Sequence, residues 1–96
     1  MRGIIWSAEA LSDLAALRRY IAKDDPAAAK RVVQRIHESV SQLAVTKAKG
    51  RPGRVTGTRE LVVVGTPYLV PYRVTGEAVE MIAVFHSSRQ WPESFF

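Results

Sequence analysis

The sequence predicts an α+β domain in which an antiparallel sheet is covered on one face by a helical hairpin. Apolar residues recur at helical spacing in two adjacent segments of the N-terminal half, and valine-rich segments separated by short turns fill the C-terminal half. Neither helix can bury its apolar stripe alone, so both need a common surface, which the strands supply. With one short strand before the helices, the expected order is β-α-α-β-β-β in a single domain over residues 1–96.

The N-terminal half is expected to hold that first strand and both helices. Residues 4–6 are an apolar run of β-forming types, and the hydroxyl of Ser7 is suited to cap a helix over residues 8–23. Asp25 is suited to cap a second helix over residues 26–44, which begins with proline. Because the link between the helices is very short, they are expected to form an antiparallel hairpin.

The C-terminal half begins with a loop over residues 46–58, which is rich in glycine and proline and holds no acidic residue. Strands are expected over residues 59–64, 68–74 and 78–86, and the short turns between them predict an antiparallel meander. Pro71 cannot donate a ladder hydrogen bond, so an irregularity is expected there. In the last strand, Val79, Met81, Ala83 and Phe85 alternate with Glu80, Ile82, Val84 and His86.

The charge balance indicates an anionic partner. Lysine and arginine number 14 against 9 aspartate and glutamate residues, which gives a net charge of +5 at pH 7. Such an excess suggests a polyanion or an acidic protein as the partner. Residues 26–44 carry three basic residues and one acidic residue, and residues 45–60 carry five and one. Because the excess lies there and not on the C-terminal strands, it suits an acidic protein at least as well as a nucleic acid.

Several classes of protein and site are excluded. The chain has no cysteine, which excludes disulfide scaffolds, thiolate zinc sites and cysteine nucleophiles. Its longest uncharged stretch, residues 61–72, contains glycine and proline and is shorter than the roughly 20 apolar residues that span a bilayer. We therefore expect a soluble, cytoplasmic protein without a membrane partner. His37 and His86 are the only histidines, and no carboxylate cluster accompanies them at ligand spacing, so no metal site and no cofactor are expected.

Basic residues are the remaining candidates for chemistry. Cleavage of RNA without a metal needs an acid or base together with a cationic clamp for the phosphorane. His86 is the candidate acid or base, and the candidate clamp is formed by Arg59, Arg73 and Arg89.

Structural roles compete with these catalytic ones. Arg73 could pair across the sheet with Glu60 or Glu80. Arg51 and Arg54 could tether the loop over residues 46–58, which we call the basic loop, to nearby carboxylates. The residues alone therefore leave the arginines with two interpretations.

Motifs along nearly the whole chain resemble those of the RelE/ParE toxin superfamily. They are Trp6 and residues 13–22, 25–29, 50–55, 57–62, 67–74 and 84–92. The resemblance implies the same β-α-α-β-β-β fold and a toxin of a type II toxin–antitoxin system, which a cognate antitoxin neutralises by direct binding. Within this superfamily, RelE-like members cut mRNA in the ribosomal A site, whereas ParE-like members poison DNA gyrase and are not nucleases.

The resemblance also bears on the choice between these targets. RelE-like nucleases carry lysines and an arginine on two neighbouring strands, and matching the strands by their turns places Glu60, Val62 and Leu69 at those positions. The C-terminal tail also lacks the tyrosine of those enzymes. We therefore favour a non-enzymatic gyrase inhibitor. The alternatives are a metal-independent endoribonuclease that uses His86 and Arg89, and an inactive homologue that only binds its antitoxin.

Under each alternative, the expected partner is an acidic antitoxin. Its segment would lie as an amphipathic helix or a strand on an apolar groove of the toxin, in a hetero-oligomeric complex. The candidate partner-binding residues are Arg51 and Arg54 of the basic loop and Trp91 near the C-terminus.

Overall fold

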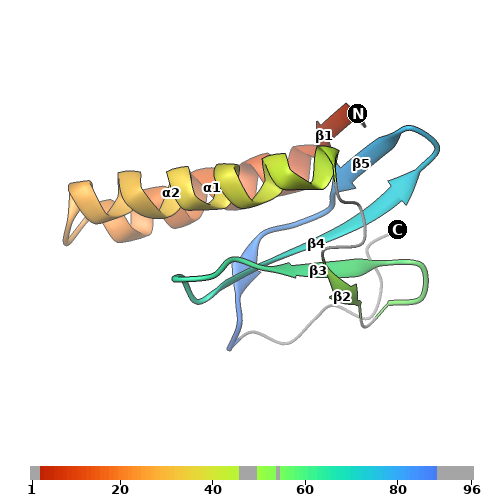
Figure 1. Cartoon of the computed structure of the whole chain (residues 1–96). Helices are drawn as coiled ribbons and strands as arrows, with labels where there is room; N and C mark the ends of the chain where they lie inside the picture. Colours follow the sequence, from red (N-terminus) through yellow and green to blue (C-terminus); the bar gives the residue numbers. More distant parts are fainter. Residues whose placement is uncertain (1–2, 46–49, 54, 89–96) are drawn as a thin grey trace.

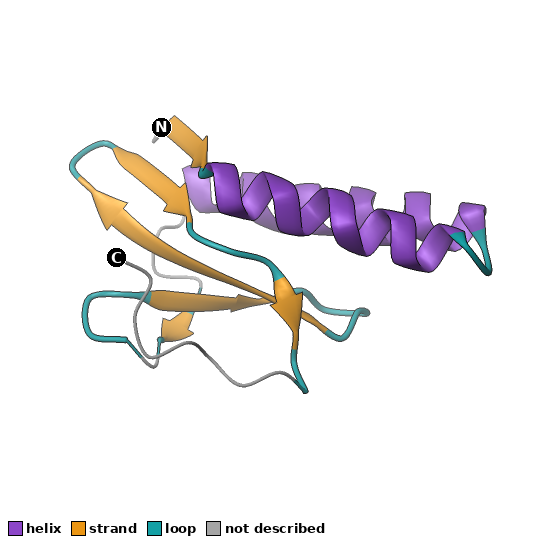
Figure 2. Ribbon diagram, turned by 180° about the vertical axis from the view of Figure 1, so that it is seen from behind, coloured by secondary structure: helices purple, strands orange, loops and turns teal. Residues whose placement is uncertain are grey.

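The computed structural model of the chain describes residues 3–45, 50–53 and 55–88. It has two layers, in which the helices α1 (Ala8–Ala22) and α2 (Pro26–Ser41) lie side by side over one face of a six-stranded sheet (Figure 1). Figure 2 shows the same layers from behind, with the two helices antiparallel and joined by a tight link. The α+β fold class and the helical hairpin predicted from the sequence are confirmed.

Both helices begin at the residues that the capping signals predict. The Ser7 side chain accepts a hydrogen bond from the Ala10 amide at 3.0 Å, and the Asp25 carboxylate accepts one from the Ala28 amide at 3.0 Å. These bonds satisfy amides that have no partner inside the helix. A short 3-10 helix, η1 (Gln42–Ala44), continues α2 to the predicted end of the helical segment.

Six strands form the sheet. They are β1 (Gly3–Trp6), β2 (Arg51–Pro52), β3 (Arg59–Val62), β4 (Tyr68–Thr75), β5 (Ala78–Met81) and β6 (Phe85–His86). Their order across the sheet is β1-β5-β4-β3-β2, and β6 pairs with β4. β3, β4 and β5 form the antiparallel meander that the short turns predict.

The sheet is mixed rather than wholly antiparallel, which corrects one detail of the expected fold. β1 pairs in parallel with β5, with Ile4 opposite Val79. Both helices and three other strands lie between β1 and β5 in the chain, so no tight turn imposes an antiparallel direction. The loop expected over residues 46–58 also contains β2, which pairs antiparallel with β3.

The last expected strand is interrupted opposite the proline of β4. Met81 lies opposite Tyr72, and Phe85 lies opposite Leu69, so three residues of one strand face two residues of β4. The extra residue makes a β-bulge over residues 82–84, which separates β5 from β6. The irregularity expected at this proline is confirmed, although it falls on the neighbouring strand.

The bulge exchanges the faces on which the side chains of the last strand lie. Before it, Val79 and Met81 pack in the core beneath the helices. Beyond it, Val84 joins the same core, whereas Phe85 belongs to a separate cluster on the other face. The simple alternation expected along this strand is therefore wrong beyond Met81, because one inserted residue reverses the side-chain parity. As a result, His86 lies on the face that the helices cover.

The main hydrophobic core lies between the hairpin and the sheet. Its largest fully buried members are Tyr72, Ile36, Leu43, Leu61, Met81, Val40, Val63, Val70 and Val79. A smaller cluster lies on the opposite face of the sheet and consists of Leu69, Ile82, Ala83 and Phe85, with Val55 packed against it. Within the described part of the chain, no helix is both long enough and apolar enough to cross a membrane.

Candidate functional site

His86 lies at a hollow between α1 and the end of the sheet, which we call the aromatic hollow. Its volume is about 630 Å³. Its lining residues are Asp13, Ala16, Leu17, Tyr20, Tyr68, Val84, Phe85, His86 and Ser88. The Tyr68 ring meets the imidazole of His86 edge-on, with ring centroids 5.6 Å apart and planes at 80°. Nδ1 of His86 accepts a hydrogen bond from the Ser88 amide at 3.1 Å, so the neutral imidazole carries its proton on Nε2.

Side chains at the start of α1 hold the bulge that forms one wall of the aromatic hollow. The Ser7 hydroxyl donates to the Ile82 carbonyl at 2.9 Å, and the Asp13 carboxylate accepts from the Val84 amide at 3.0 Å. Both backbone groups lie in the bulge, where the ladder of the sheet cannot satisfy them. Sequence reasoning identified Ser7 as a cap and missed this second role. It missed the role of Asp13 as well, because a helix pattern cannot show which distant amide a carboxylate meets.

Burial changes the pKa of Tyr68, one of the side chains that line this hollow. The pKa of Tyr68 is raised above its usual value, mainly because burial disfavours the phenolate and secondarily because Tyr20 lies nearby. Tyr68 is therefore a neutral phenol at physiological pH. It presents a ring and a hydroxyl rather than a charge.

The candidate clamp residue Arg59 lies at the other end of the same face. Its guanidinium donates to the Gly50 carbonyl at 3.0 Å, and the Tyr72 hydroxyl accepts from the Gly50 amide at 2.9 Å. A Cβ at Gly50 would come within 2.7 Å of that hydroxyl, so only glycine fits there. Arg59 lies opposite Tyr72 of β4, and His86 lies opposite Tyr68 of the same strand. Tyr68 and Tyr72 are four residues apart, which corresponds to about 13 Å along the strand.

Burial also raises the pKa of Tyr72. The amide of Gly50 and the charge of Arg59 oppose that rise, because both favour the phenolate. Arg59 therefore acts on the buried phenol of the core rather than on the imidazole of the aromatic hollow.

The described arginines on the open face of the sheet have carboxylate partners. Nε of Arg73 lies 2.7 Å from Oε1 of Glu80 on β5. Arg51 forms an ion pair with Glu60, whose side chain is almost fully buried. The structural interpretations of Arg73 and Arg51 are thus the ones that the geometry matches.

The sequence-predicted residues do not all meet in one place. His86 and Arg59 lie at opposite ends of the covered face, and Arg73 lies on the open face. Three further candidates, Arg54, Arg89 and Trp91, fall outside the described residues. Among the residues that are described, no three histidine or carboxylate side chains gather closely enough to hold a metal ion.

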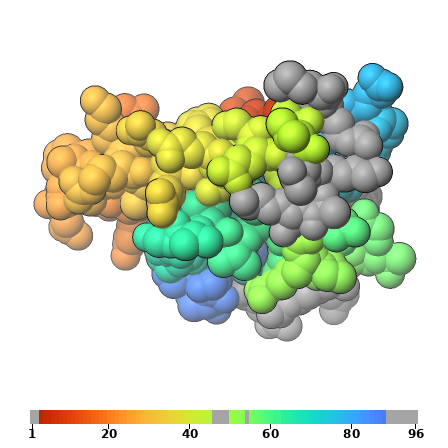
Figure 3. Space-filling model, viewed as in Figure 1, coloured from red at the N-terminus to blue at the C-terminus, as the bar shows by residue number. Residues whose placement is uncertain are grey.

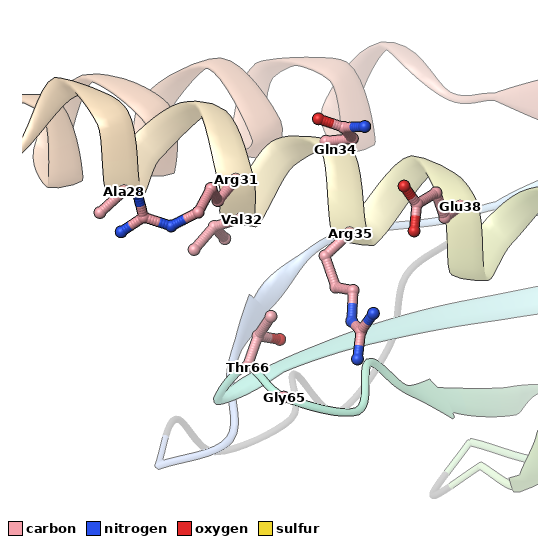
Figure 4. Close-up of a pocket in the computed structure, with 8 residues that line it drawn as sticks. All are labelled: Ala28, Arg31, Val32, Gln34, Arg35, Glu38, Gly65 and Thr66. Carbon is pink, nitrogen blue, oxygen red and sulfur yellow. The ribbon is translucent and has the colours of Figure 1, made fainter.

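A second hollow lies on the other side of the hairpin, between α2 and the turn that joins β3 to β4 (Figure 4). We call it the basic hollow; its volume is about 530 Å³. Its lining residues are Ala28, Arg31, Val32, Gln34, Arg35, Glu38, Gly65 and Thr66. In the space-filling view, α2 (yellow) lies directly above this turn (blue-green) (Figure 3). Sequence reasoning counted the basic excess of this helix without assigning it a site.

Comparison with known proteins identifies the family. The family model described as "ParE toxin of type II toxin-antitoxin system, parDE" matches residues 4–91. The chain belongs to this ParE toxin family. Y4kP of Sinorhizobium fredii is 49% identical over 90 residues, which are 94% of this chain and 93% of that protein. Toxin RelE2 of Caulobacter vibrioides is 37% identical over 89 residues, which are 93% of this chain and 99% of that protein.

Solved structures agree with the ParE assignment. A chain of the chromosomal ParDE toxin–antitoxin system of P. aeruginosa superposes with a TM-score of 0.79 at 30% identity, covering 90% of this chain and 96% of that one. A chain of the toxin–antitoxin complex RelBE2 of Mycobacterium tuberculosis superposes with a TM-score of 0.56 at 24% identity. The match covers 88% of this chain and 96% of that one, and it supports the fold alone. The protein is thus a type II toxin of the ParE/RelE superfamily, as the resemblance implied.

Proposed function

We propose that this ParE-family toxin arrests growth by poisoning DNA gyrase through protein binding, without active-site chemistry. The dispersal of its candidate catalytic cations supports this proposal. An endoribonuclease must bring a cationic clamp within reach of the group that moves the proton. In this chain Arg73 is paired with Glu80, and Arg59 donates to the Gly50 carbonyl. The β4 partners of Arg59 and His86 are four residues apart, about 13 Å along the strand.

The ribosome-dependent endoribonuclease is the second candidate. His86 supports it, because its imidazole is exposed and lies beside Tyr68 in the aromatic hollow. The imidazolium form of such a side chain is able to act as an acid at Nε2, and its neutral form is able to donate a hydrogen bond there. The clamp would then require Arg89, which falls outside the described residues.

We further propose that an acidic antitoxin neutralises the toxin in a hetero-oligomeric complex. The aromatic hollow supports this part, because apolar and aromatic side chains line it, as in grooves that receive amphipathic helices. Arg51, Arg54 and Trp91 remain the proposed contacts of the basic loop and the tail. The neighbour of known structure from P. aeruginosa belongs to a ParDE system, which fits a toxin of this kind.

Two assays run side by side test the target. Purified toxin should make gyrase lose supercoiling activity or accumulate cleaved DNA, and it should leave mRNA intact in a ribosome assay. His86→Ala should retain the effect on gyrase, with Ser87→Ala as the matched exposed control and circular dichroism to verify folding. Cleavage of mRNA that His86→Ala abolishes, together with no effect on gyrase at micromolar toxin, would reject gyrase poisoning in favour of the nuclease.

A further inference from the structure

The basic hollow holds two guanidinium groups that form no ion pair with a described carboxylate. Arg31 and Arg35 are exposed and lie one helical turn apart on α2, about 6 Å along its axis. Glu38 also lines the hollow, so two positive side chains and one negative side chain line it. The positive charge of this surface is therefore available to a ligand.

Arg35 is held in place before any ligand binds. Its Nε donates to the Val64 carbonyl at 2.9 Å, so the terminal nitrogens remain available as donors. Figure 4 shows the Arg35 side chain extending from α2 towards the turn at Gly65. Gly65 makes room for the guanidinium, because a Cβ there would lie 3.3 Å from Nη2 of Arg35. A guanidinium that is already ordered loses less conformational entropy when it binds an anion.

The lining of the basic hollow indicates what kind of anion it fits. Arginine, glutamine and threonine are side chains that contact phosphate oxygens, and Arg31, Gln34, Arg35 and Thr66 provide this set. A docking groove for an amphipathic segment needs large apolar anchors, and here Val32 is the largest aliphatic side chain in the lining. Such anchors line the aromatic hollow instead, so the chemistry of the basic hollow favours a phosphate backbone over a peptide.

We infer that the basic hollow contacts phosphates of duplex DNA, with Arg31 and Arg35 as the two binding residues. The inference rests on the proposed function, because the duplex in question is the segment that gyrase holds. It deepens that function, since a poison that touches both enzyme and DNA would stabilise the complex in which the DNA is cleaved. The contact is independent of base sequence, as backbone contacts carry no sequence information directly.

Binding of a fluorescent duplex, measured by anisotropy over a series of salt concentrations without gyrase, tests this contact. The double variant R31Q/R35Q should reduce the slope of log K against log salt by about 2, since each phosphate contact contributes about 1. The matched variant R18Q/R19Q removes the same charge from exposed residues of α1 and should leave the slope unchanged. R31Q alone should reduce it by about 1 and leaves the bond between Arg35 and Val64 intact.

Several outcomes would overturn the inference. If R31Q/R35Q and R18Q/R19Q reduced the slope of log K against log salt equally, duplex binding would depend only on the net charge of the protein. If the toxin bound a single-stranded RNA more tightly than the duplex, DNA would be rejected as the ligand. If it bound a polyglutamate peptide through these arginines and did not bind the duplex, the occupant would be an acidic protein. The gyrase assay separates the two proposals, because wild-type toxin that binds the duplex and leaves gyrase unaffected rejects gyrase poisoning alone. A duplex slope that R31Q/R35Q leaves unchanged, with gyrase still poisoned, rejects the DNA contact alone.

Discussion

The two hollows beside the helical hairpin differ in chemistry and in how they are held together. Leu17, Tyr20 and Tyr68 give the aromatic hollow an apolar lining, whereas Arg31 and Arg35 dominate the basic hollow. Apolar lining favours a partner that buries apolar surface against it, while a basic surface attracts and orients an anionic partner. The difference teaches that one small domain can offer two chemically distinct surfaces, one to each side of the same pair of helices.

The largest expected effect concerns the wall of the aromatic hollow. Asp13→Ala removes the acceptor of the Val84 amide and leaves that amide unsatisfied in the bulge, which should lower the free energy of unfolding by about 1–3 kcal/mol. Denaturant unfolding measures this change. Asp13→Asn keeps an acceptor oxygen, so its free energy of unfolding should fall by less than that of Asp13→Ala. Duplex binding should be the same for folded Asp13→Ala and wild type, and a large loss of binding would show that the two hollows are not separate.

An intermediate effect is expected at the turn beneath the basic hollow. Gly65 and Gly57 both have φ of 85°, so an alanine at either position should cost about 1–2 kcal/mol of stability. Only Gly65 also faces Arg35, whereas a Cβ at Gly57 would meet nothing within 4 Å. We expect Gly65→Ala to be the less stable variant in thermal unfolding and to weaken duplex binding, while Gly57→Ala binds normally. Equal binding by the two variants would contradict the ordered position of Arg35.

The smallest expected effect is the pH dependence that Tyr68 adds to the aromatic hollow. Its pKa is raised in the folded state, so folding favours the neutral phenol. That contribution to stability is fully present below the unfolded pKa near 10 and is lost as pH rises through the folded pKa. Tyr68→Phe should therefore make the decline of stability above pH 10 less steep, although Tyr72 still contributes to it. Chemical unfolding across this pH range measures the slope.

A control for this titration is Tyr20→Phe. Burial is the larger cause of the raised Tyr68 pKa and Tyr20 the smaller one, so the substitution should lower that pKa only slightly. Absorbance of the phenolate follows the titration directly. Identical profiles for wild type and Tyr68→Phe would contradict the assignment of the pKa shift to Tyr68.

Local signals in the sequence predicted the framework of the fold well. Ser7 and Asp25 were identified as helix caps, and both accept the expected backbone hydrogen bonds. The short turns predicted the meander of β3, β4 and β5. These features depend on residues close together in the chain, so composition and spacing are enough to predict them.

Features that join distant segments were not predicted. The parallel pairing of β1 with β5 and the bond from Asp13 to Val84 depend on which segments meet in space. The bulge moved His86 to the covered face, since a shift of one residue reverses every later side chain. For the same reason the sequence showed a basic second helix but not the hollow in which Arg35 meets the turn at Gly65.

The bonds between the start of α1 and the bulge have a consequence for synthesis of the toxin. Ser7 and Ile82 are 75 positions apart, and Asp13 and Val84 are 71 apart. At about 5–20 residues per second, roughly 4–15 s pass on the ribosome between making the first partner and making the second. During that interval β1 also lacks the strand with which it pairs. The toxin therefore forms these bonds only after the bulge has been translated, so a chain cut short before the bulge would lack them.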